Sequence, residues 1–156
     1  MHPNAKKISF TPEGFTTLKK EQEELLVQRP IAVTELKKAR EMGDLSENGA
    51  YKGAKALVGH IDSRLRHLAH LIAHADVRVS GQKGIVDLDA YVVVTDDIEE
   101  RKFHIVGEHE ASPMDGKISH RSPIGSKLMG RKEGERVEIQ TPRGIIIYTI
   151  VKISQT

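Results

Sequence analysis

Apolar residues in the first half of the chain recur at alternating steps of three and four positions, the spacing of a helix that packs along a partner helix. The first series has eight positions: Phe15, Leu18, Gln22, Leu25, Arg29, Ala32, Leu36 and Ala39. Just before it, Thr11 can cap a helix, Pro12 suits the first helical position and Glu13 lies near the positive helix end. A helix is therefore predicted to begin near Pro12.

A second series with the same spacing follows a short turn that contains glycine. Its members are Tyr51, Ala54, Val58, Ile61, Leu65, Leu68 and Ile72. Two such series, joined by a short turn, can bury their apolar faces against each other only by folding back. The pattern predicts an antiparallel coiled-coil hairpin. An arm of about 30 residues is roughly 45 Å long, so the turn is expected far from the rest of the protein.

In the second half, short β-branched runs bounded by turn residues predict strands. These runs cover residues 90–95, 102–108, 136–141 and 145–153. Between them, Ser122, Pro123 and Gly130 are spaced as the cap, first residue and end of one short helix. The flexible "SGQKG" indicates a boundary, so we predict two domains, residues 1–79 and 80–156. The predicted class is α+β, a helical hairpin followed by a small antiparallel sheet.

Composition narrows the possible functions. With 38% hydrophobic and 29% charged residues, the 156-residue chain has the balance of a soluble globular protein. The absence of cysteine excludes disulfides, thiolate metal sites and cysteine catalysis. A net charge of +2 does not by itself indicate nucleic-acid binding. With no export signal or membrane span recognisable, and no serine-hydrolase, Walker or zinc-protease motif, we expect a cytoplasmic protein without an autonomous catalytic site.

The turn "MGDLSENG" places two carboxylates, Asp44 and Glu47, between the predicted helices. One interpretation is a capping box, in which Asp44 accepts from the backbone N–H of Glu47 and Glu47 reaches back. The other is that the carboxylates offer oxygen ligands to a hard cation such as Mg²⁺, with a partner or substrate completing the site. The two interpretations are partly compatible.

Four histidines lie on the second predicted helix: His60, His67, His70 and His74. Their spacings suit a transition metal. However, the helical register places them on the outward side, and exposed pairs without supporting hydrogen bonds are poor metal sites. We therefore favour a solvated, pH-sensitive basic face that includes Arg64 and Arg66.

Three motifs resemble those of the bacterial Gre transcript cleavage factors, the GreA/GreB family. "GDLSENGAY" is similar to the family's tip signature G-D-[LR]-[SK]-E-N-A-[ED]-Y. "ISHRSPIGSKLMGRKEGERVEIQTPRG" is similar to its C-terminal signature, and "TPEGFTTLKKE" to its opening. The motifs occur in the family's order and span nearly the whole chain.

The resemblance implies a protein that is not an enzyme alone. Its coiled coil would enter the secondary channel of bacterial RNA polymerase and reach the 3′ end of backtracked nascent RNA. Asp44 and Glu47 match the acidic pair that helps hold a second Mg²⁺, so that the polymerase's own site cleaves the RNA. This Mg²⁺ is shared with the polymerase, and no cofactor is expected to be bound stably. A monomer without membrane association is implied.

The resemblance also implies supporting roles. The tip would be supported by Gly43, Leu45, Ser46, Asn48 and Tyr51. The second domain would be FKBP-like and would dock on the polymerase, with Ser122 and Pro123 in its signature. Arg64 and Arg66 are candidates for contact with RNA phosphates.

The chain departs from the tip signature at Gly49 and Ala50, where the family usually has alanine and an acidic residue. A looser or less active tip is one consequence, which keeps open a Gre-like paralogue that occupies the channel and inhibits or modulates the polymerase without cleavage. An FKBP-like isomerase or chaperone with a coiled-coil handle is a third possible function, and a structural adaptor is a fourth. "GDLSEN" leans toward GreA, whereas Arg64 and Arg66 are closer to the more basic GreB type.

Overall fold

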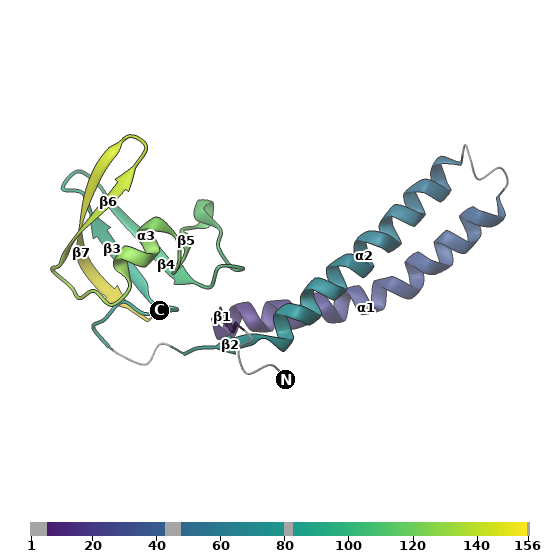
Figure 1. Cartoon of the computed structure of the whole chain (residues 1–156), viewed down its shortest axis with the longest axis horizontal. Helices are drawn as coiled ribbons and strands as arrows, with labels where there is room; N and C mark the ends of the chain where they lie inside the picture. Colours follow the sequence, from purple (N-terminus) through teal and green to yellow (C-terminus); the bar gives the residue numbers. More distant parts are fainter. Residues whose placement is uncertain (1–5, 43–47, 80–82, 156) are drawn as a thin grey trace. The chain divides into compact units, whose positions relative to one another are not determined.

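The structure is a computed structural model that describes residues 6–42, 48–79 and 83–155 (Figure 1). The chain divides into two compact units. One is Thr16–His74, and the other combines the N-terminal segment through Phe15 with the chain from Ala75 onward. The predicted boundary between residues 79 and 80 borders residues 80–82, which lie outside the described residues. No helix in the described ranges is both long enough and apolar enough to cross a membrane.

The first unit is a helical hairpin. Helix α1 spans Pro12–Glu41 and helix α2 spans Gly49–Ala73. Every position of the two predicted apolar series is buried or half-buried except Arg29. The helices are antiparallel, because Glu21 bonds to Arg64 near one end of the hairpin and Ala39 bonds to Asn48 near the other. Figure 1 shows α1 and α2 running side by side, as the sequence predicted.

The second unit contains a five-stranded sheet in the order β5-β4-β3-β7-β6. The four predicted strands are present as β3 (Tyr91–Thr95), β4 (Glu100–Val106), β6 (Arg136–Thr141) and β7 (Gly144–Ser154). The predicted short helix is α3 (Pro123–Leu128). The pairs β3–β4, β3–β7 and β6–β7 are antiparallel. The predicted α+β class is therefore confirmed.

Four short elements were not predicted. Strand β5 (Lys117–Ser119) pairs parallel with β4, so the sheet is not wholly antiparallel. Strands β1 (Ile8–Phe10) and β2 (Ala75–Val77) form a separate parallel pair. The 3-10 helix η1 spans Pro113–Asp115.

The core of the second unit gathers side chains from the sheet and from α3. Alternate residues of β3, Val92 and Val94, are fully buried, and Leu128 of α3 is buried with them. This is the expected pattern for a sheet with one covered face. The other buried members of the cluster are Val86, Ile105, Ile118, Val137, Ile139, Tyr148 and Ile150.

Within the second unit, Glu110 binds the residues at the start of α1, which belong to that unit through Phe15. Its carboxylate accepts hydrogen bonds from the backbone N–H of Thr11 at 2.9 Å and of Gly107 at 3.2 Å, and from the Thr11 hydroxyl. The same hydroxyl oxygen accepts from the backbone N–H of Gly14 at 3.1 Å, so Thr11 caps α1 as predicted. The first turn of α1 is thus anchored by a carboxylate that lies 99 residues away in sequence.

Candidate functional site

The predicted site lies in the segment that connects α1 to α2. Five of its residues, Gly43, Asp44, Leu45, Ser46 and Glu47, lie outside the described residues. The structure does describe the two helix ends that carry this segment. Helix α1 ends at Glu41 and helix α2 begins at Gly49.

Asn48 caps α2 and also bonds to α1. Its side-chain oxygen accepts from the backbone N–H of Tyr51 at 3.2 Å, which is the N-cap hydrogen bond. Its side-chain nitrogen donates to the carbonyl oxygen of Ala39, 2.9 Å away near the end of α1. Asn48 therefore fills the N-cap position of α2, and the capping box predicted between Asp44 and Glu47 lies outside the described residues. Both ends of the connecting segment are tied by one amide side chain.

Tyr51 and Arg40 add a second contact between the helix ends. The guanidinium carbon of Arg40 lies 5.8 Å from the centre of the Tyr51 ring, within reach of a cation–π attraction. Tyr51 is half-buried. At Gly49, a Cβ atom would meet no atom within 4 Å. Packing in the described residues therefore does not exclude the alanine that the family usually has there.

Arg64 forms an ion pair across the hairpin. Its Nε and one terminal nitrogen donate to the two carboxylate oxygens of Glu21 at 2.7 and 2.9 Å. The hydrogen bond from Arg64 holds the pKa of Glu21 below its ordinary value. Arg66 is exposed. The two arginines predicted as one basic face thus have different environments, because position 64 lies beside the packed seam and position 66 faces outward.

A second pair, not foreseen from the sequence, links Arg29 to Asp62. The Arg29 Nε donates to one carboxylate oxygen of Asp62 at 2.6 Å. Arg29 is a position of the first apolar series, and its side chain remains 45% exposed. A charged residue is tolerated at that position because its head group reaches the rim of the helix interface. The sequence did contain a signal for this pair. Asp62 directly follows Ile61, a buried position of the second apolar series, and so lies beside the helix interface.

The histidines lie on the outer side of α2, as the helical register predicted. His60, His67 and His70 are exposed, and His74 is half-buried. His70 and His74 lie close together, with ring centres 4.4 Å apart. Among the described residues, no group of three or more metal-ligating side chains occurs.

Ser122 and Pro123 start α3 as predicted. The Ser122 hydroxyl oxygen accepts from the backbone N–H of Gly125 at 3.0 Å, and the hydroxyl donates to the carbonyl oxygen of Ser119 at 2.7 Å. Pro123 occupies the first helical position and is exposed. Their local roles are structural, and the exposed proline remains available for contact with another molecule.

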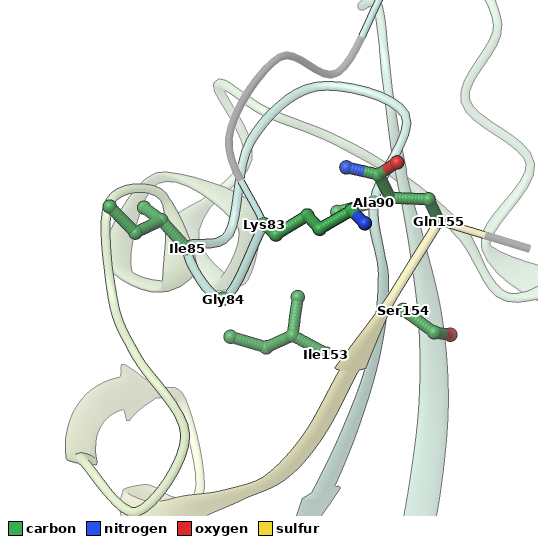
Figure 2. Close-up of a pocket in the computed structure, with 7 residues that line it drawn as sticks. All are labelled: Lys83, Gly84, Ile85, Ala90, Ile153, Ser154 and Gln155. Carbon is green, nitrogen blue, oxygen red and sulfur yellow. The ribbon is translucent and has the colours of Figure 1, made fainter.

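A separate pocket of about 270 Å³ lies in the second unit. Figure 2 shows the Lys83 side chain extending toward Gln155. The full lining is Lys83, Gly84, Ile85, Ala90, Ile153, Ser154 and Gln155. None of the predicted site residues belongs to it.

Comparison with known proteins identifies the chain. Residues 8–77 match the family model "Transcription elongation factor, N-terminal". Residues 81–155 match "Transcription elongation factor, GreA/GreB, C-term". The two models describe the N-terminal and C-terminal parts of one class of protein, the transcription elongation factors, and together they match nearly the whole chain. The chain belongs to the GreA/GreB family of that class, which confirms the resemblance seen in the sequence.

Two GreA proteins agree with this assignment. The chain is 37% identical over 152 residues to transcription elongation factor GreA of Caulobacter sp. (strain K31), covering 94% of this chain and 97% of the relative. It is 39% identical over 155 residues to GreA of Nitrosococcus oceani, with the same coverage. A solved structure, GreA factor homolog 1 (Gfh1) of Thermus thermophilus, is 24% identical with a TM-score of 0.46, covering 96% of this chain and 99% of that chain.

Proposed function

We propose that this protein binds bacterial RNA polymerase, enters its secondary channel with the 43–47 segment foremost, and stimulates cleavage of the 3′ end of backtracked RNA. Family membership supports a role in elongation, and the tip signature with both Asp44 and Glu47 supports cleavage. The observation that carries the proposal is the Asn48 bond to Ala39. It closes the end of the hairpin directly beside the two carboxylates in sequence.

The helix lengths suit this task. With 30 and 25 residues, α1 and α2 extend about 45 Å and 37 Å at the standard helical rise. Such a hairpin can carry a short acidic segment deep into a narrow channel. This role explains why Asp44 and Glu47 lie in a short segment between two long helices, without the other residues of a complete catalytic site.

In the proposed mechanism, Asp44 and Glu47 help to hold Mg²⁺ in the polymerase active site. Carboxylate oxygens are the donors that Mg²⁺ prefers, but two of them do not complete its octahedral shell. The polymerase and RNA would supply the remaining ligands. The ion's contribution when bound is to activate water and stabilise the leaving oxygen. The protein is therefore an activator of the polymerase rather than an enzyme, and no cofactor is bound stably to the chain alone.

The other predicted residues have secondary roles in this proposal. Because Glu21 holds Arg64, contact with RNA phosphates falls mainly to Arg66. Ser122 and Pro123 form part of the surface that docks on the polymerase. The protein acts as a monomer in the cytoplasm.

The test is a halted, backtracked polymerase complex with end-labelled RNA and Mg²⁺. Addition of the chain should release short 3′ fragments and restore elongation. Binding accompanied by inhibition, without fragments, would instead establish the channel-occupying paralogue, with Gly49 and Ala50 as its first explanation. Failure to bind the polymerase would reject both functions.

A further inference from the structure

We propose that His70 and His74 form a binding site for a divalent transition-metal ion, with Zn²⁺ as the probe, at the C-terminal end of α2. The two residues are four positions apart and therefore lie on the same face of the helix. Their ring centres are 4.4 Å apart, with the ring planes inclined by 39°. Imidazole nitrogens bind Zn²⁺, Cu²⁺ and Ni²⁺ well. This site goes beyond the proposed function, which uses neither histidine.

A supporting hydrogen bond orients one of the two rings. The Nδ1 atom of His74 lies 2.9 Å from the carbonyl oxygen of His70. Because a carbonyl oxygen only accepts, this contact favours the tautomer with the proton on Nδ1. The lone pair of Nε2 is then available to a metal. Metal-binding histidines characteristically use one ring nitrogen in this way to orient the other.

The electrostatic setting also favours a cation. His70 lies in the last turn of α2, and His74 is its C-cap residue. Backbone carbonyls without helical partners concentrate negative partial charge at this end of a helix, which attracts positive charge. A bound ion would thus gain from the helix as well as from the two rings.

Coordination by this pair is incomplete. Zinc sites usually have four ligands at about 2.0–2.1 Å from imidazole nitrogen. In the described part of the chain, no third metal-ligating side chain joins the pair. We therefore expect weak binding, with positions left for water or for a ligand from another molecule.

The test titrates Zn²⁺ into the metal-stripped full-length chain by calorimetry, with His70→Ala, His74→Ala and His60→Ala as variants. The wild type should bind one ion that depends on the pair, and each of the first two substitutions should weaken this binding by at least about tenfold. His60 is the matched control, because it is exposed on the same helix about 15 Å from His70 along the axis. Its removal should leave binding unchanged.

Nitrogen NMR of the histidine rings gives an independent reading. Zinc should shift the Nε2 signal of His74 while its Nδ1 remains protonated. Equal binding by the wild type and the His70→Ala and His74→Ala variants would overturn the proposal, as would an equal loss with His60→Ala. Circular dichroism verifies that each variant keeps its helices. Since no polymerase is present, the result is independent of the cleavage assay.

Discussion

The side-chain nitrogen of Asn48 donates to the carbonyl oxygen of Ala39 at 2.9 Å, joining the start of α2 to the end of α1. The same side chain caps α2 through the backbone N–H of Tyr51. Two helix ends are therefore held by one residue. This contact joins the two helices that precede and follow the 43–47 segment in sequence.

Replacing Asn48 should weaken both the hairpin and its activity. Asn48→Ala removes the cap and the bond to Ala39, and we expect it to lower the free energy of unfolding by about 1–2 kcal/mol. Cleavage should fall by about tenfold or more, since small displacements of aligned groups are costly. Asn48→Asp keeps the cap acceptor but loses the donor to Ala39. If Asn48→Asp cleaves RNA as fast as wild type, the bond to Ala39 does not position the tip.

The Glu21–Arg64 pair should make hairpin stability depend on acid pH. Because the hydrogen bond from Arg64 lowers the pKa of Glu21 in the folded protein, its stabilisation is complete above the ordinary carboxyl pKa. It is lost as the pH falls through the lowered pKa. The pair is 36% exposed on both sides, so its contribution is at most about 1 kcal/mol. The measurement is urea unfolding followed by helical circular dichroism from about pH 6 to about pH 3.

Arg64→Gln is the control for this effect. The difference in unfolding free energy between wild type and variant should shrink as the pH falls. A constant difference across the range would show that Arg64 stabilises the hairpin by packing rather than by its charge.

Two glycines should respond to alanine in opposite directions. At Gly107, an added Cβ would lie 2.0 Å from the backbone carbonyl oxygen of Ser9, so Gly107→Ala should destabilise by about 1–3 kcal/mol. At Gly53, inside α2, an added Cβ meets nothing within 4 Å. Gly53→Ala should stabilise by about 0.5–1 kcal/mol because alanine is the better helix former. Denaturant unfolding measures both changes, and equal effects would contradict the packing at Gly107.

Repetition explains which elements could be predicted from the sequence. The apolar series that contains Ile61 and Leu68 repeats over many helical turns, and so does the series in α1. Each repeat is a separate indication of a helix, so the two long helices could be predicted. By contrast, β1 and β5 have three residues each and leave no local period. The strands with which they pair are distant in sequence or separated from them by a loop, so the pairing cannot be read from neighbouring residues. Ile8, for example, pairs with Ala75.

The candidate site shows the same limit. Asp44, Ser46 and Asn48 are all good N-cap residues, and spacing alone favoured Asp44 because of Glu47. The cap falls on Asn48, whose amide can also donate to Ala39. Unlike the carboxylate of an aspartate, an amide provides an acceptor for one helix and a donor for the other. The need for a donor arises because the start of α2 lies against the end of α1. A short sequence motif at the start of α2 carries no information about this contact.

Ser122 allows capping and docking to be separated. Ser122→Ala removes the cap of α3 and should cost about 1 kcal/mol of stability. Ser122→Asp keeps a cap acceptor but, like Ser122→Ala, loses the hydroxyl that donates to the carbonyl oxygen of Ser119, and it adds a charge. If Ser122 contacts the polymerase, Ser122→Asp should weaken binding in a competition assay more than its loss of stability, compared with that of Ser122→Ala, accounts for. Unchanged binding by both variants would remove Ser122 from the docking surface.

The acidic pair beside Asn48 is proposed to act within the polymerase active site, and this is the central claim. The most direct measurement compares wild type, Asp44→Asn and Glu47→Gln on a backtracked complex with end-labelled RNA, recording cleavage rate and polymerase affinity together. We predict that each variant loses cleavage by about a hundredfold or more while affinity stays within about twofold. Full cleavage by both variants at unchanged affinity would contradict the account.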